Sequence, residues 1–394
     1  MTKFIFLGAL LAATQLNAFT QLTLYTKRAH ATPLFAIDIE QEIKKEDLKE
    51  PLSLRVPIKF VGPYPTIGLR FPDLSTKNQK AQNKTGISLD FVLDTAANTN
   101  TINAQVASEL ELEVVGEALP GLSSAGAMKG GATYMLGDSQ LDGIELNEEL
   151  GENGIFMQNL TASALPIASP ASAGLLSLPF FYCFEGGVEF SWGSSALKDG
   201  LPDPTGTSIT FYGDEETAKK EALSGMTRVE IDPIPVTQLP SVMLNINGMK
   251  VPALLDTGSP ITVLNSQAAK AAGIETIQLP AEEKSNNPFS GFANRFKNAQ
   301  AMAKAAQNGE ILTIAGSDGK PTNLLKSTST VDVSVSGDED VSFGSGHIYV
   351  GDIPGLAALN GIGVDSPPAA VLGMDVLRMR PKMFLRARNQ EVFF

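Results

Sequence analysis

The apolar positions of this chain fall in short runs, and glycine, proline, asparagine or aspartate separates one run from the next. Long heptad patterns are absent. This arrangement is typical of β-strands joined by turns, and it disfavours a helical bundle. The 394 residues suffice for two ordinary domains, each with a sizeable core. We therefore predict an all-β protein with few short helices.

Two halves of the chain repeat one order of elements. Each half has a strand, a turn, a second strand that ends in Asp-Thr, a third apolar strand and an amphipathic helix, expected at 103–110 and at 265–272. The two Asp-Thr stretches read FVLDTAANTNTI (91–102) and ALLDTGSPITVL (253–264). Three further matches follow in order: 133–144 with 347–356, 173–181 with 369–377, and the strands of 186–213 with those of 383–394. Matched elements in one order indicate a duplicated domain.

These repeats divide the chain. We place an N-terminal lobe at 52–213, an inter-lobe connection that begins as a helix at 214–230, and a C-terminal lobe at 231–394. An insert near 280–330 lengthens the C-terminal lobe and is expected to contain a helix near 292–307.

The first 36 residues carry three Lys or Arg and no acid. An apolar run too short to cross a bilayer precedes Ala18, so residues 1–18 are interpreted as a signal peptide and residues 19–36 as a transit segment. A signal peptide followed at once by Phe19 resembles the bipartite plastid leaders of algae, and secretion or an endomembrane lumen is the alternative. We expect no stable membrane anchor after the leader is removed.

Charge and rare residues exclude several classes of function. Residues 37–394 hold 27 basic and 43 acidic residues, a formal net charge of −16, which leaves no electrostatic footprint for nucleic acid. Cys183 is the only cysteine, and the two histidines are His30 and His347, so a zinc site built from several His or Cys ligands is excluded by count. Carboxylates are nearly the only acid–base groups that remain.

The two repeated aspartates offer such chemistry. Asp94 and Asp256 hold equivalent positions in duplicated lobes, so we expect them to meet near the pseudo-twofold axis. Two carboxylates about 3 Å apart share one proton, which lets one draw a proton from water while the other donates to a carbonyl. Thr95 and Thr257 have hydroxyls able to tie the two loops together, Gly258 permits a tight turn, and Ser259 can hydrogen-bond to its aspartate.

LLDTGSPITVL together with AVLGMDVL (370–377) resembles the aspartic peptidases, with short lobes of the retropepsin type duplicated as in the bilobal pepsins. The resemblance implies two acid-protease lobes, barrel-like with a ψ-loop, around a central cleft. It also implies a flap hairpin, which we expect within 121–135. By the family pattern the catalytic residues are Asp94 and Asp256, supported by Thr95, Thr257, Gly258 and Ser259. The resemblance further implies a monomer that cleaves a peptide or protein substrate, with no metal or cofactor.

The N-terminal lobe departs from this pattern at two positions. Ala96 stands where the other lobe has Gly258, and Ser177 stands where it has Gly373. An alanine in place of a glycine costs roughly 1 kcal/mol or more if φ is positive, so the dyad geometry is expected to loosen. A non-catalytic protein that keeps the cleft for peptide or ligand binding is therefore the alternative function. A third hypothesis is that the C-terminal lobe alone dimerises into the active form.

Overall fold

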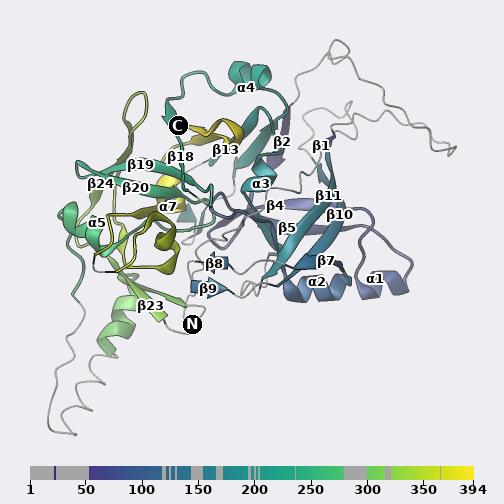
Figure 1. Cartoon of the computed structure of the whole chain (residues 1–394), viewed down its shortest axis with the longest axis horizontal. Helices are drawn as coiled ribbons and strands as arrows, with labels where there is room; N and C mark the ends of the chain where they lie inside the picture. Colours follow the sequence, from purple (N-terminus) through teal and green to yellow (C-terminus); the bar gives the residue numbers. More distant parts are fainter. Residues whose placement is uncertain are drawn as a thin grey trace, which may run out of the picture.

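The computed structural model describes residues 22–23, 53–117, 121–123, 126–128, 131–142, 154–165, 172–193, 197–198, 201–202, 205–235, 237–278, 300–315, 321–363 and 365–394. Apart from Leu22–Thr23, which form strand β1, the predicted leader lies outside the described residues. Much of the predicted insert, residues 279–299 and 316–320, lies outside them as well. The chain forms two β-rich lobes, one from each repeat (Figure 1).

The N-terminal lobe is a nine-stranded sheet that curls on itself. Its strands are β1, β3 (Lys59–Val61), β4 (Tyr64–Phe71), β5 (Ile87–Leu93), β6 (Thr101–Asn103), β7 (Glu113–Glu117), β10 (Ala132–Asp142), β11 (Gly154–Leu165) and β12 (Gly174–Leu176). The order β11-β6-β12-β5-β4-β10 closes into a ring because the long strand β10 pairs with both β4 and β11. Register shifts along β10 let it bend between these two partners.

The C-terminal lobe is a ten-stranded sheet. Its strands are β18 (Asp232–Pro233), β19 (Pro240–Ile246), β20 (Met249–Leu255), β21 (Val263–Leu264), β22 (Ile311–Ala315), β23 (Pro321–Lys326), β24 (Val331–Val335), β25 (Val341–Gly346), β26 (Tyr349–Val350) and β27 (Ala370–Leu372). Strands β22 and β23 come from the predicted insert and extend one edge of this sheet beyond β26.

The two sheets share a five-strand arrangement. The order β11-β6-β12-β5-β4 corresponds to β26-β21-β27-β20-β19, and every neighbouring pair has the same parallel or antiparallel sense in both lobes. The predicted duplication is therefore present in the fold. One predicted match is wrong. The counterpart of β26 is β11, because each runs parallel to the strand after its aspartate, whereas residues 133–142 of the predicted partner belong to β10.

A third sheet joins the lobes. Its six strands, in spatial order, are β17 (Arg228–Glu230), β29 (Glu391–Phe393), β28 (Lys382–Arg386), β13 (Gly187–Ser191), β16 (Ser208–Tyr212) and β2 (Ser53–Pro57). Strand β13 of the first repeat pairs with β28 of the second, so the predicted terminal strands of the two halves meet at this pair. Two small two-stranded sheets complete the β-structure: β8 (Gly121–Ser123) with β9 (Gly126–Met128), and β14 (Leu197–Lys198) with β15 (Leu201–Pro202).

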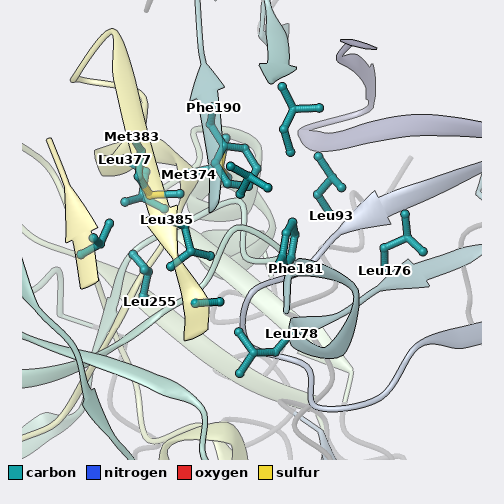
Figure 2. Close-up of a cluster of buried hydrophobic side chains, with 14 of the residues drawn as sticks. Leu93, Leu176, Leu178, Phe181, Phe190, Leu255, Met374, Leu377, Met383 and Leu385 are labelled. Carbon is teal, nitrogen blue, oxygen red and sulfur yellow. The ribbon is translucent and has the colours of Figure 1, made fainter. Parts of the chain in front are cut away.

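Buried side chains of both lobes form one hydrophobic cluster between the sheets. Figure 2 shows Leu93 and Leu176 from the N-terminal lobe near Phe190 of the joining sheet, together with Leu255 and Met374 from the C-terminal lobe. Leu93 and Leu255 are fully buried, and each directly precedes an aspartate of the repeat. The strands that carry the two aspartates therefore end in a packed interior.

The helices are short. They are α1 (Lys77–Ala81), α2 (Ala104–Leu110), α3 (Leu178–Phe181), α4 (Glu215–Glu221), α5 (Ser266–Ala271), α7 (Met374–Leu377) and the 3₁₀ helices η2 (Pro354–Leu359) and η3 (Ala387–Asn389). Helices α2 and α5 confirm the two predicted after the repeated strands, and Asn103 and Asn265 cap their first turns. Residues 300–307 are helical, and the rest of the helix predicted near 292–307 lies outside the described residues. Among the described residues, no helix is long and apolar enough to cross a membrane.

Candidate active site

Asp94 and Asp256 occupy the same place in the two lobes. Each directly follows a strand that runs parallel to a short apolar strand, β5 beside β12 and β20 beside β27. The amide of Asp94 donates to the carbonyl of Leu176 (2.9 Å), and the amide of Asp256 donates to that of Leu372 (3.1 Å). Both aspartates are buried, with 0 % and 2 % of their surface exposed. Burying a carboxyl group is costly, so its ionisation depends on what lies beside it.

Thr95 and Thr257 bind the two aspartate turns to each other. The Thr95 amide donates to the Thr257 hydroxyl (3.1 Å), and the Thr257 amide donates to the Thr95 hydroxyl (3.0 Å). Each hydroxyl then donates to the strand of the opposite lobe, Thr95 to the carbonyl of Leu255 (2.7 Å) and Thr257 to that of Leu93 (2.8 Å). All four hydrogen bonds are buried and cross between lobes, which confirms the predicted tie between the loops.

Gly258 places the backbone of one lobe against the carboxyl group of the other. A Cβ at Gly258 would lie 2.5 Å from Cγ of Asp94 and 2.6–2.8 Å from its two oxygens, closer than a real Cβ can come. The φ angle of Gly258 is not positive, so glycine is needed here for space. The predicted turn at Gly258 therefore requires glycine because the two lobes approach each other closely there.

Asp256 holds its proton more tightly than an ordinary carboxyl group. Burial raises the pKa of Asp256 well above its usual value, and the charge of Asp94 raises it further. Hydrogen bonds from the backbone amides of Gly258 and Ser259 lower the pKa of Asp256 but do not cancel these two effects. Two buried aspartates that influence each other in this way favour a state in which the pair keeps one proton.

Ser259 supports Asp256 through its backbone, in contrast to the predicted side-chain hydrogen bond. Its hydroxyl donates to the carbonyl of Ile261 (2.7 Å). Its own carbonyl accepts from the amide of Met374 (2.8 Å), as that of Ala97 accepts from Leu178 (2.9 Å) in the N-terminal lobe. The buried turn directs the hydroxyl along the chain, so Ser259 and Ala97 play the same backbone role.

Ala96 is not strained. Its φ is not positive, so the expected backbone penalty does not arise. Its methyl group is buried and joins a hydrophobic cluster of the C-terminal lobe that includes Leu254, Ile261 and Ile353. Alanine at this position therefore adds an apolar contact between the lobes.

Ser177 fits where its counterpart must be glycine. A Cβ at Gly373 would lie 2.2 Å from the carbonyl oxygen of Ile261. Ser177, also fully buried, instead donates from its hydroxyl (2.9 Å) and from its amide (3.0 Å) to Oδ1 of Asn100. The loop after Asp94 thus leaves room for a side chain that the loop after Asp256 excludes.

Asn98 is a residue that the sequence interpretation missed. It follows Ala97 in the loop after Asp94, and both polar atoms of its side-chain amide are buried without a hydrogen-bond partner. A buried amide with an unused donor and an unused acceptor is costly unless a ligand satisfies it. No pattern around Asn98 signals this role, because asparagine is common in loops.

The region expected to hold a flap contains the β8–β9 hairpin. The backbone of this hairpin lies close to η2 of the other lobe, and η2 also lies close to β20, which carries Asp256 at its end. The hairpin and the strand that carries Asp256 therefore lie against the same 3₁₀ helix. Residues 118–120, 124–125 and 129–130 lie outside the described residues.

Other polar residues that the sequence offers have local partners. Asp352 accepts hydrogen bonds from the amide and hydroxyl of Ser266, Asp138 accepts from the amide of Asn159, and the ring of His347 contacts Ser327. Cys183 is half-buried, and burial raises the pKa of its thiol. In the described part of the chain, no three His, Cys, Asp or Glu side chains gather as a metal site would require.

Part of the second repeat matches one known family of protein sequences. A sequence family described as "Aspartyl protease" matches residues 242–287, which include Asp256. No curated protein sequence matches the chain. Among solved structures, the chain is similar to basic 7S globulin from soybean and to conglutin gamma, a basic 7S globulin from lupine seeds. For each the TM-score is 0.42, the sequence identity is 11 %, and the alignment covers 88 % of this chain and 95 % of the other.

Proposed function

We propose that the protein is an aspartic-type endopeptidase that hydrolyses peptide bonds with Asp94 and Asp256. The observation that carries this proposal is the pairing of two equivalent, buried Asp-Thr turns through four hydrogen bonds between lobes. A structural aspartate would not need a matched partner from the other repeat. The family match over residues 242–287 supports the same class of chemistry.

The proposed reaction uses the single proton of the pair. The ionised carboxyl group takes a proton from a water molecule, and the protonated one donates its proton to the carbonyl oxygen of the scissile peptide bond. Water oxygen bonds to the carbonyl carbon to give a tetrahedral intermediate. The carboxyl group that took the proton from water then donates a proton to the amide nitrogen, the C–N bond breaks, and a hydroxyl of the intermediate returns its proton to the other carboxylate as the carbonyl double bond re-forms. The pair is then left with one proton, as at the start. The proton belongs to the pair, so we assign neither aspartate a fixed role.

Two features support a polypeptide as the ligand. Asn98 has an unused hydrogen-bond donor and an unused acceptor, and a peptide main chain offers the complement of both. The β8–β9 hairpin, in the region where a flap was expected, contacts η2, which also contacts the strand that carries Asp256.

The pH dependence follows from the state of Asp256. Because the pKa of Asp256 is raised, the pair retains its proton to a higher pH than an ordinary carboxyl group would. Activity should fall as the pH rises through the pKa of the pair, since the fully ionised pair has no proton to donate. It should also fall in strong acid, when both carboxyl groups are protonated.

Cleavage of a diverse peptide library from about pH 3 to about pH 8 tests the proposal. Wild-type protein should cleave, Asp94→Asn and Asp256→Asn should each lose activity by at least about 10³-fold, and a transition-state analogue such as pepstatin should inhibit. Asp138→Asn is the matched control, because Asp138 is an exposed acid in the same lobe that accepts one local hydrogen bond. Wild-type activity no greater than that of Asp256→Asn at every pH would contradict the proposal.

A protein that binds peptides without cleaving them is the second candidate. Ala96 and Ser177 suggested it from the sequence, but the fold accommodates both residues. The observation that favours it is the unsatisfied amide of Asn98, which would serve peptide binding without cleavage equally well. In that case fluorescence polarisation would detect binding of labelled peptides to wild type and to Asp256→Asn alike, with no cleavage by either. Binding without cleavage would favour this second function, and cleavage by wild type alone would exclude it.

A further inference from the structure

Asp375 is an ionisable residue of the C-terminal lobe that the proposed reaction does not use. It lies in the first turn of α7, two residues after Gly373. The hydroxyl of Thr262 donates to Oδ1 of Asp375 (2.7 Å), and the amide of Val376 donates to the same oxygen (2.8 Å). The residue reaches solvent, so its carboxyl group can exchange a proton with water.

The hydroxyl of Thr262 connects Asp375 to the backbone under Asp256. It donates to Asp375 and accepts a hydrogen bond from the amide of Gly373 (3.0 Å). Leu372, the residue before Gly373, accepts from the amide of Asp256 (3.1 Å). We call residues 256–262 and 372–375, joined by these hydrogen bonds, the Asp256 clamp.

The N-terminal lobe builds the same clamp without an ionisable group. Asn100 and Thr262 each stand six residues after the aspartate of their lobe. Asn100 accepts from the amide of Ser177 (3.0 Å), as Thr262 accepts from that of Gly373. The position that corresponds to Asp375 is Pro179. Only the clamp of the C-terminal lobe therefore ends on a group whose charge changes with pH.

We propose that Asp375 is a positioning residue, and that its ionisation tightens the clamp that holds Asp256 in place. The proposal rests on the proposed peptidase function, because its effect is on the geometry of the aspartate pair. An ionised carboxylate accepts a hydrogen bond about twice as strongly as a neutral carboxyl group. The ionised form of Asp375 thus orients the Thr262 hydroxyl toward itself and leaves a lone pair for the amide of Gly373.

The groups around Asp375 set the pH at which its carboxyl group ionises. Although the residue is exposed at the surface, the protein packed around its carboxyl group raises the pKa of Asp375 to about 6, and hydrogen bonds from Thr262 and Val376 oppose that rise. From β26, Tyr349 faces Asp375: burial, and then the charge of Asp375, raises the pKa of the Tyr349 phenol, which stays neutral near pH 6. Directly after α7, the guanidinium of Arg378 lies over the ring of Phe60, 5.3 Å from its centroid. Strand β25 also packs against this helix, and its Ser342 carbonyl accepts a hydrogen bond from the charged guanidinium of Arg380 (3.5 Å).

Kinetics give the first test. On top of the pH dependence set by the aspartate pair, which both proteins share, wild-type kcat relative to that of Asp375→Asn should fall by about fivefold between pH 7 and pH 5 with a midpoint near pH 6, and KM should change little. Asp375→Asn should remove this step from the pH profile, because asparagine cannot ionise. Thr262→Val should lower kcat at all pH values, and Thr262→Ser, which keeps the hydroxyl, should restore the wild-type profile. A step of unchanged size and midpoint in Asp375→Asn would overturn the proposal.

Hydrogen exchange gives a second test that needs no catalysis. After correction for intrinsic rates, the amides of 372–376 should exchange faster below about pH 6 in wild type but not in Asp375→Asn. The segment 176–180 of the other lobe is the internal control and should show no such change in either protein. Equal pH dependence of 372–376 in both proteins would overturn the role of Asp375. If exchange behaves as expected but wild type cleaves no peptide, the proposed peptidase function fails while the clamp stands.

Discussion

Removal of one threonine hydroxyl between the two aspartate turns tests whether these hydrogen bonds hold the lobes together. Thr257→Val keeps the shape of the side chain and deletes the hydroxyl. The amide of Thr95 and the carbonyl of Leu93 then lose their partners in a fully buried site. A buried polar group left without a partner costs about 1–3 kcal/mol, so the two together should lower the free energy of unfolding by about 2–6 kcal/mol. Thr95→Val leaves the Thr257 amide and the Leu255 carbonyl unpartnered and should cost a similar amount.

Urea denaturation followed by tryptophan fluorescence can measure this loss. Trp192 is the only tryptophan, is fully buried, and stacks on Phe190 with ring centroids 5.0 Å apart, so its emission reports on the interior of the molecule. Thr101→Val is the matched control, because Thr101 of the N-terminal lobe is as fully buried as Thr257 and its hydroxyl has no hydrogen-bond partner. That variant should be neutral or slightly stabilising. A loss below about 1 kcal/mol in Thr257→Val, or one equal to that of Thr101→Val, would refute the reasoning.

Three further outcomes follow from the site. Gly258→Ala brings a methyl group within 2.5 Å of the Asp94 carboxyl group, so peptidase kcat/KM should fall by about 10²-fold or more; wild-type kinetics would contradict this contact. Gly373→Ala should destabilise the protein by more than about 3 kcal/mol because the added Cβ meets a backbone carbonyl at 2.2 Å, whereas Ser177→Ala should cost only about 1 kcal/mol; thermal unfolding of the two variants compares them. The raised pKa of Asp256 means that its contribution to stability is largest below the unfolded pKa and is lost as the pH rises through the folded pKa, so Asp256→Asn should flatten the dependence of Tm on pH above about pH 4.

The repeated strand–Asp-Thr–strand–helix order was the most predictive feature of the sequence. It located Asp94 and Asp256 at equivalent strand ends and located helices α2 and α5. Apolar runs, turn residues and caps are local signals, so they can be recognised without knowledge of the fold. The hydroxyls of Thr95 and Thr257 could be assigned a tie between lobes because duplicated turns must face each other across a pseudo-twofold axis.

Errors arose where a residue's role depends on a partner far along the chain. Segment 133–144 was matched to 347–356 by its similar letters, but the ladder between β6 and β11 shows that β11 is the true counterpart of β26. Ser259 was expected to bind Asp256 with its hydroxyl, yet the turn directs that hydroxyl to Ile261. Asn98 and Asp375 gave no signal in the sequence, because their importance comes from an unsatisfied amide and from a hydrogen bond to Thr262.

The sequence by itself determined that the chain is a duplicated β protein with one aspartate turn in each half, since both conclusions depend only on local pattern and its repetition. Tertiary structure alone decided why the two turns differ. Gly258 must lack a side chain because the carboxyl group of Asp94 lies against it, while Ala96 places its methyl group in the core of the C-terminal lobe. Ser177 fits because the side chain of Asn100 accepts a hydrogen bond from its hydroxyl. Gly373 cannot carry a side chain because the backbone of Ile261 fills that space. Such constraints are distances between atoms of different segments, and only the folded chain brings those atoms together.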